Sequence, residues 1–179
     1  MRLTSSYKMK LTGDLIALKT SITVYRNALR TLIPIIDDNW EILSEYNFVN
    51  QKYRCIERWV HNTQTNQAIY DVDEQFPKFP TYLRRSAVAK ALGIVSSYRS
   101  NLAIWEKNPK GQAPKLSLNH YTYPAYYREG MFRNFDPIRQ TIELKVYKNN
   151  DWVFETYKLK TSDCTYYQKY LAGNKQNVP

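Results

Sequence analysis

The sequence predicts a mixed α+β fold in which a helical bundle is inserted after the first strand of a small wedge-type β-barrel. A strand-like pattern stands alone at residues 6–11, a long run of helical periodicity follows it, and further strand-like segments fill the C-terminal third. Because a lone strand must pair to satisfy its backbone hydrogen bonds, its partners must come from the C-terminal segments. The predicted barrel comprises residues 1–13 and 113–179, and the predicted helical domain comprises residues 14–112.

The first strand and the first helix are separated by a change of period at residues 12–14. Residues 6–11 alternate between apolar and polar, as in a half-buried strand, whereas the apolar residues after Asp14 are spaced three and four apart, as on one face of a helix. Asp14 is the expected helix N-cap. Pro34 is expected to kink or end this helix near Leu32, because proline lacks a backbone N–H.

Three further amphipathic segments predict helices. One runs from Trp40 to about Tyr46, one covers residues 50–63, and one begins near Thr81 and continues to about Trp105. The intervening stretch is polar and punctuated by prolines, which is typical of a loop. The helical domain therefore contains four predicted helices.

Charge is sorted along the helical domain. Residues 34–76 carry eight acids and three bases, a net charge of −5, whereas residues 78–111 carry seven bases and a single acid, a net charge of +6. The whole chain has a net charge of +10. Surface helices usually mix their charges, so a strongly basic helix favours an anionic partner such as nucleic acid. The alternative is a helix that packs on its neighbours and whose basic side chains are simply solvated.

Gly93 lies in the middle of this basic helix. Glycine costs about 1 kcal/mol relative to alanine at such a position. A close approach of another helix or of a nucleic-acid backbone would explain a glycine here.

The C-terminal third combines a tyrosine-rich segment with a β-hairpin. Residues 121–127, YTYPAYY, contain four tyrosines and are followed by arginines, and these side chains together offer stacking surfaces for bases and donors for phosphates. The alternative is an edge strand whose tyrosines pack in the core. Strand patterns at 141–147 and 152–159 flank a turn at 149–151, which predicts the hairpin. Residues 161–163 are the expected cap of a last helix.

The sequence contains no recognisable motif for catalysis, metal binding or membrane insertion. The five glycines form no phosphate-binding loop and no nucleophile elbow. The two cysteines, Cys55 and Cys164, and the two histidines, His61 and His120, are not at zinc-ligand spacing, and the cysteines are expected to be free thiols. No apolar run approaches the ~20 residues of a membrane span. We therefore expect no catalytic site, no metal, no cofactor and no membrane association for this chain.

Five blocks of the sequence resemble, in the same order, the N-terminal part of TnpB proteins, the OrfB "transposases" of bacterial insertion sequences and ancestors of type V CRISPR effectors. The blocks are SYKMKLTG, KFPTYLRRSAVAKALGIVSSYRSNLAIWE, YPAYYREGMF, IELKVYKNNDWVFETYKL and TSDCTYY. The resemblance covers about residues 6 to 179. It implies a wedge β-barrel interrupted by a helical recognition lobe. The RuvC-type nuclease domain of the family would follow this chain, which is then a truncated or split reading frame or an N-terminal region.

The resemblance implies binding of a guide RNA and of double-stranded DNA at a short target-adjacent motif, in the bacterial cytoplasm and in association with the nucleoid. A separate polypeptide carrying the RuvC nuclease is a further implied partner. The residues expected to contact DNA are Tyr82, Arg84, Arg85, Ser96, Ser97, Arg99, Asn101, Thr122, Tyr123, Tyr126, Tyr127 and Arg128. The residues expected to contact RNA are Lys8, Lys10, Lys110, Lys115, Arg133 and Lys145.

Two alternatives remain open at this stage. One is a nuclease-free, DNA-binding regulator derived from the same family. The other is a protein–protein interaction module whose basic face meets an acidic partner.

Overall fold

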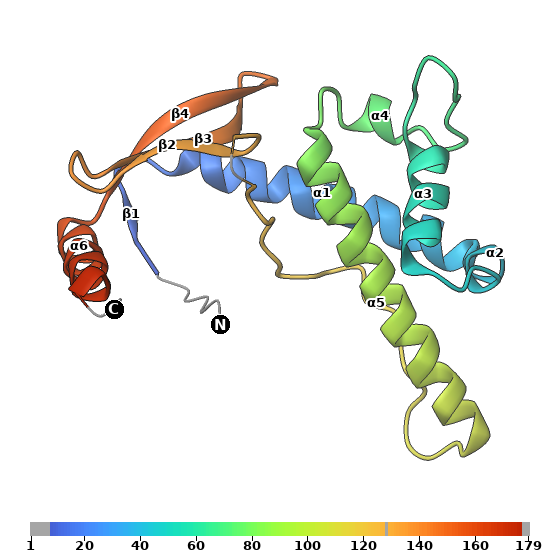
Figure 1. Cartoon of the computed structure of the whole chain (residues 1–179). Coiled ribbons are helices and arrows are strands. Elements are labelled where there is room, and N and C mark those ends of the chain that lie inside the picture. Colours follow the sequence, from blue (N-terminus) through green and yellow to red (C-terminus); the bar gives the residue numbers. More distant parts are fainter. Residues whose placement is uncertain (1–7, 128, 177–179) are drawn as a thin grey trace. The chain divides into compact units, whose positions relative to one another are not determined.

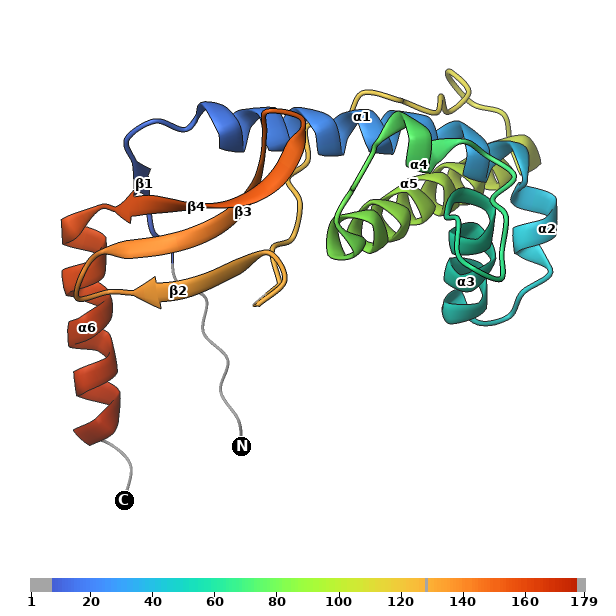
Figure 2. The ribbon, with the colours of Figure 1, turned by 90° about the horizontal axis from the view of Figure 1, so that it is seen from above.

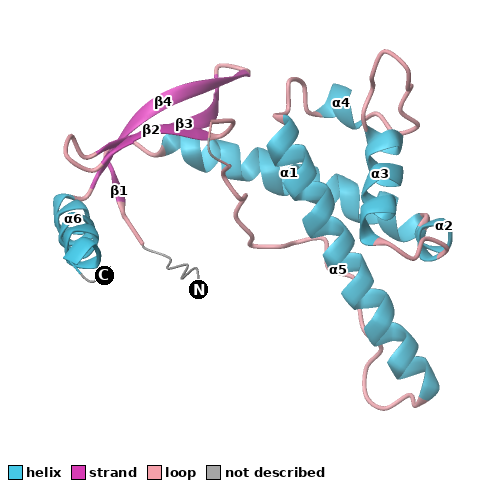
Figure 3. Ribbon diagram, in the orientation of Figure 1, coloured by secondary structure: helices cyan, strands magenta, loops and turns pink. Residues whose placement is uncertain are grey.

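The computed structural model describes residues 8–127 and 129–176 and shows a mixed α+β protein, about half of it helical (Figure 1). The mixed α+β class predicted from the sequence is confirmed. Figure 3 distinguishes the helices, the strands and the loops. In chain order the elements are β1 (Leu11–Thr12), α1 (Ile16–Asp38), α2 (Trp40–Ser44), α3 (Val49–Val60), α4 (Val72–Gln75), α5 (Thr81–Lys107), β2 (Phe132–Asp136), β3 (Thr141–Lys148), β4 (Asp151–Leu159) and α6 (Thr161–Gln176).

The chain divides into two compact units. Unit 1 combines the segment that ends at Ser21 with the segment that begins at Tyr126, and it contains all four strands named above and α6. Unit 2 comprises Ile22–Ala125 and contains most of α1 together with α2 to α5. One boundary therefore falls inside α1, and the other falls inside the tyrosine-rich segment.

The strands of unit 1 form an antiparallel sheet in the order β1-β4-β3-β2 (Figure 2). The first strand pairs with the C-terminal set, as predicted, with Leu11 opposite Leu159. The strand is shorter than predicted: residues 8–10 are not in a strand, and the earlier part of the predicted strand lies outside the described residues. Because β1 and β2 are the two edges, the described residues form an open sheet, and the predicted barrel is not confirmed.

The β3–β4 hairpin is confirmed. Its two-residue turn consists of Asn149 and Asn150, with φ angles of 52° and 60°. Two successive positive φ angles are typical of a type I′ turn, whose twist matches that of the flanking strands. Strand β2 was not predicted, because a register irregularity between Arg133 and Asp136 and a φ of 50° at Asn134 break the alternation of the side chains.

The core of unit 1 lies between the inner face of the sheet and the start of α1. Leu144, Val146 and Tyr157 are buried there. Partly buried side chains from several elements pack against them: Leu11, Leu15, Ala17, Leu18, Tyr126, Phe132 and Ile142. The Ser21 hydroxyl accepts a hydrogen bond of 2.7 Å from the Tyr147 N–H, which ties α1 to β3. Side chains alternate between the two faces along a strand, so the residues next to Leu144, Val146 and Tyr157 on β3 and β4 point to the outer face of the sheet.

The start of α1 is capped as predicted, and its end is not where the sequence placed it. The Ile16 N–H donates a hydrogen bond of 2.8 Å to the carboxylate of Asp14. The helix continues through Pro34 to Asp38, so of the two outcomes predicted for Pro34 the ending near Leu32 is wrong, and the kink stays a prediction. Full burial of Ile33 and Ile36 contributes about 1.5–3 kcal/mol each, which offsets the roughly 3 kcal/mol that a proline costs inside a helix.

Helix α5 begins at Thr81, as predicted, and its apolar face belongs to the core of unit 2. The buried positions lie at helical spacing and are Leu83, Ala87, Val88, Ala91, Leu92 and Val95. The Tyr25 hydroxyl lies 3.2 Å from the Ser86 hydroxyl, which joins α1 to α5. Short helix α4 lies within the stretch that the sequence predicted as loop.

Candidate nucleic-acid interface

The part of the tyrosine-rich segment that belongs to unit 2 contacts an arginine from α1. The guanidinium carbon of Arg26 lies 5.5 Å from the ring centre of Tyr121 and 5.2 Å from that of Tyr123. Arg26 Nε donates a hydrogen bond of 3.1 Å to the carbonyl oxygen of Thr122, which holds the guanidinium close to both rings. The tyrosines remain 91% and 71% exposed. This cluster, the Arg26–tyrosine cluster, presents aromatic faces and one cation to solvent.

A groove of about 460 Å³ lies beside α5. Its lining includes Lys90, Gly93 and Ser97 from the helix and His120, the residue just before the tyrosine-rich segment. The imidazole Nε2 of His120 lies 2.7 Å from the carbonyl oxygen of Ser117, which restrains the ring. Apart from its two chain neighbours and the backbone of its own helix, a methyl group built on Gly93 would have no described atom within 4 Å. Packing of another helix therefore does not account for this glycine, whereas a ligand in the groove would use the space.

A second basic and aromatic surface lies on the outer face of the sheet in unit 1. Arg133 and Lys145 both approach Phe154, with Arg133 Cζ 3.9 Å and Lys145 Nζ 5.7 Å from the ring centre. Lys145 and Phe154 are direct cross-strand partners, so they share one face of the sheet. Two residues that the sequence assigned to RNA thus meet at one aromatic ring.

Glu143 restrains Arg133 on this face. Its carboxylate accepts a hydrogen bond of 2.8 Å from the Asn134 amide and one of 2.7 Å from Arg133 Nε. Both bonds favour the ionised form, and they hold the pKa of Glu143 below its ordinary value. The surface therefore keeps its carboxylate charged and its arginine oriented.

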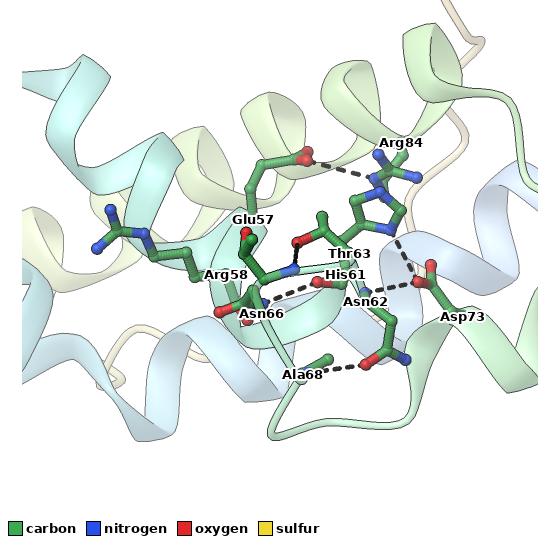
Figure 4. Close-up of polar contacts among 10 residues, drawn as sticks. Glu57, Arg58, His61, Asn62, Thr63, Asn66, Ala68, Asp73 and Arg84 are labelled. Carbon is green, nitrogen blue, oxygen red and sulfur yellow. Dashed lines mark hydrogen bonds and ion pairs between the residues drawn. The ribbon is translucent and has the colours of Figure 1, made fainter.

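Arg84, which the sequence placed among the DNA contacts, is buried. Its side chain is 7% exposed, and its Nε lies 3.3 Å from the carboxylate of Glu57 on α3 (Figure 4). The other carboxylate oxygen of Glu57 is buried and accepts no hydrogen bond from any described residue. The guanidinium thus compensates a buried charge inside unit 2, while neighbouring Arg85 is exposed.

Arg99, another predicted DNA contact, is held at the end of α1. Its Nε donates a hydrogen bond of 2.6 Å to the Asp37 carboxylate, and its terminal nitrogen donates one of 2.8 Å to the Asp37 carbonyl. Two bonds to one residue fix the guanidinium in place. The geometry of Arg99 therefore links α5 to α1.

The remaining predicted residues are divided between the two units, and their contacts with nucleic acid stay predictions. In unit 2, Ser96 and Thr122 are partly buried, and the exposed ones are Tyr82, Arg85, Ser97, Asn101, Lys110, Lys115 and Tyr123. In unit 1, Lys8, Lys10 and Tyr127 are exposed, and Arg128 lies outside the described residues.

Tyr126 belongs to the interior of unit 1. Its hydroxyl donates a hydrogen bond of 3.0 Å to the carbonyl oxygen of Lys145, and burial raises its pKa to about 12. Such a tyrosine stays neutral and supports the sheet from beneath Lys145.

His61 and Asp73 organise the connection between α3 and α4. The carboxylate of Asp73 lies 2.7 Å from His61 Nδ1 and accepts a hydrogen bond of 2.8 Å from the Asn62 N–H (Figure 4). Over residues 8–127 and 129–176, no group of three His, Cys, Asp or Glu side chains is arranged to hold a metal ion. Within the same ranges, no helix has the length and apolarity needed to cross a membrane. The His61–Asp73 pair therefore serves the loop.

Sequence reasoning missed Arg26 and Phe154. Each has a sequence signal that can be recognised only once the structure is known. Arg26 is a basic residue next to the buried Tyr25, and Phe154 lies out of phase with the buried Tyr157 and Leu159 of β4. Arg84 carried one too, because Arg84, Val88 and Leu92 are spaced four apart and all three are buried.

Comparison with known proteins gives a family. No curated protein and no solved structure matches the chain. The model of the Aq_aa04 family matches residues 3–148, which include every element from β1 to β3. The chain therefore belongs to the Aq_aa04 family.

Proposed function

We propose that this chain is the nucleic-acid-binding region of a TnpB-like, RNA-guided DNA endonuclease, which binds a guide RNA and a short target-adjacent DNA motif. In this proposal unit 2 acts as the recognition lobe. The four-stranded sheet of unit 1 acts as the wedge element, whose closure into a barrel is part of the proposal. The chain itself supplies binding and not strand cleavage.

One observation carries the proposal. Helix α5 and His120, the residue that immediately precedes the tyrosine-rich segment, line one groove, to which the helix contributes Lys90, Gly93 and Ser97. Exposed aromatic rings stack on bases, and lysine and hydroxyl groups bind phosphates, so this combination is chemically suited to nucleic acid. The Arg26–tyrosine cluster on the same segment adds a guanidinium whose charge is partly shielded by the two rings.

The sheet surface around Phe154 supports an RNA contact. Arg133 and Lys145 bring two cations to one ring, and a planar guanidinium above an aromatic ring is suited to stacking with an unpaired base. This pattern favours a nucleic acid over an acidic protein, because an acidic protein surface has no bases to stack.

The proposal is tested by binding measurements on the purified 179-residue chain. We expect ribonuclease-sensitive RNA in the preparation, and binding of labelled RNA and duplex DNA in fluorescence anisotropy. The combined substitution Tyr121→Ala and Tyr123→Ala should weaken binding by about 1–3 kcal/mol for each base that stacks, or roughly 5- to 150-fold. Tyr166→Ala, an exposed tyrosine of unit 1, is the control.

Three results would change the proposal. Failure to bind any nucleic acid at low salt would overturn it. Binding of duplex DNA without any RNA would point to the nuclease-free regulator. Binding of an acidic protein that nucleic acid does not displace would point to the interaction module.

A further inference from the structure

A groove between α3 and α5 in unit 2 is lined by three arginines. It has a volume of about 550 Å³, and its lining includes Arg54 and Arg58 from α3, Arg85 from α5 and the ring of Tyr53. All three arginines are exposed. Only Arg85 was considered from the sequence, because Arg54 and Arg58 lie in the acidic part of the helical domain.

The arginines of this groove are not engaged in ion pairs with any described residue. Over the part of the chain that the structure describes, no ion pair engages Arg54, Arg58 or Arg85. Arg54 and Arg58 are four residues apart on one helix, where like charges destabilise the helix by about 0.2–0.5 kcal/mol. No ion pair within the described residues offsets this cost.

The carboxylate that lines the groove, Glu57, is neutralised by the buried Arg84. Glu57 is the one carboxylate in the lining, and its ion pair with Arg84 compensates its charge. In Figure 4 the Arg58 side chain extends away from the Glu57–Arg84 pair. Arg84 and Glu57 together are neutral, so the groove keeps the charge of its three exposed guanidinium groups.

We infer that this groove binds the phosphate backbone of a single strand of nucleic acid, through Arg54, Arg58 and Arg85. Guanidinium groups match phosphate oxygens in geometry and charge. Proteins that bind single strands combine a positively charged groove that follows the backbone with aromatic rings on which bases stack. The ring of Tyr53 supplies a face for a base. This inference rests on the proposed nucleic-acid function and adds a second contact area to the groove beside α5.

The test compares variants of equal charge. Arg54→Gln with Arg58→Gln removes two cations from the groove, and Arg30→Gln with Lys107→Gln removes two exposed cations elsewhere in unit 2. Affinity for a labelled single-stranded oligouridine is measured over a series of salt concentrations in the full chain. The slope of log K against log salt changes by about 0.7 for each phosphate contact that is lost on a single strand.

We expect the groove variant to reduce the slope by about 1.4, Arg85→Gln to reduce it by a further ~0.7, and the control to leave it unchanged. Circular dichroism melting should show that all variants stay folded.

Equal slope changes in groove and control variants would overturn the inference, because they would indicate diffuse attraction. The inference would also be overturned if the groove variant lost more affinity for a 20-base-pair duplex than for the single strand, or if polyglutamate of equal charge displaced the RNA. If the wild-type chain binds no nucleic acid, the proposed function fails. If the wild type binds and only the slope prediction fails, the groove assignment alone is wrong.

Discussion

Arg84 and Glu57 form an ion pair between α5 and α3 in which the arginine is 7% and the carboxylate side chain 24% exposed. Transfer of two charges out of water is costly, and their mutual attraction repays that cost only while both are present. The neighbouring Arg85 is exposed and lines the groove on the same two helices. Two adjacent arginines of one basic helix thus have different physical roles.

Arg84→Ala should therefore act on stability. It leaves the Glu57 charge uncompensated, and one oxygen of this carboxylate already has no hydrogen-bond donor among the described residues. We expect the free energy of unfolding to fall by about 3–5 kcal/mol, as measured by denaturant unfolding. Arg85→Ala is the matched control and should change it by less than about 0.5 kcal/mol. Similar losses for the two variants would contradict the assignment of Arg84 to the interior.

Gly93→Ala should separate stability from binding. The added methyl group meets no described atom within 4 Å beyond its chain neighbours and the backbone of its own helix, and it improves helix propensity, so the free energy of unfolding should rise by up to about 1 kcal/mol. The same methyl group occupies the groove beside Lys90 and Ser97, so RNA affinity should fall. Ala103→Gly, at an exposed position of α5, should lower stability and leave binding unchanged. A stabilised Gly93→Ala variant with full affinity would remove the groove from the proposed interface.

The pH dependence of the sheet surface follows from Glu143. Because the pKa of this carboxyl is lowered in the folded protein, its contribution to stability is fully present above the pKa of an unfolded glutamate and is lost as pH falls through the folded value. Asn134→Ala removes the largest cause and should raise the Glu143 pKa toward its ordinary value. Carbon-detected NMR titration of the side chain measures it, with Asn27→Ala as the control. An unchanged pKa would show that the Asn134 bond is not formed in solution.

The chain should bind without cleaving. Asp37, Glu57 and Asp73 are each engaged with a basic or imidazole side chain of unit 2, and metal-dependent scission needs carboxylates that converge on an ion. Incubation with guide RNA, target DNA and Mg²⁺ or Mn²⁺ is expected to leave the DNA intact. Scission that persists through repurification and disappears when an acid of this chain is replaced would disprove this prediction.

Much of the fold was predictable from patterns of residues that are close together in the sequence. Helix α5 was predictable because its apolar residues recur at helical spacing and no proline interrupts them. The β3–β4 hairpin was predictable because Asn149 and Asn150 tolerate the positive φ angles that its turn requires. Each of these features depends on residues close together in the chain, where sequence spacing determines spatial proximity.

The sequence by itself determined the mixed α+β class, the basic helix, the hairpin and the pairing of the first strand with the C-terminal strands. Only the tertiary structure decided that Arg84 turns to Glu57 while Arg85 faces solvent, and that Arg26 lies close to Tyr121 and Tyr123. The same holds for Pro34, which remains inside α1. These outcomes depend on how elements distant in sequence pack against one another. Burial and the pairing of charges are properties of that packing, and local periodicity does not contain them.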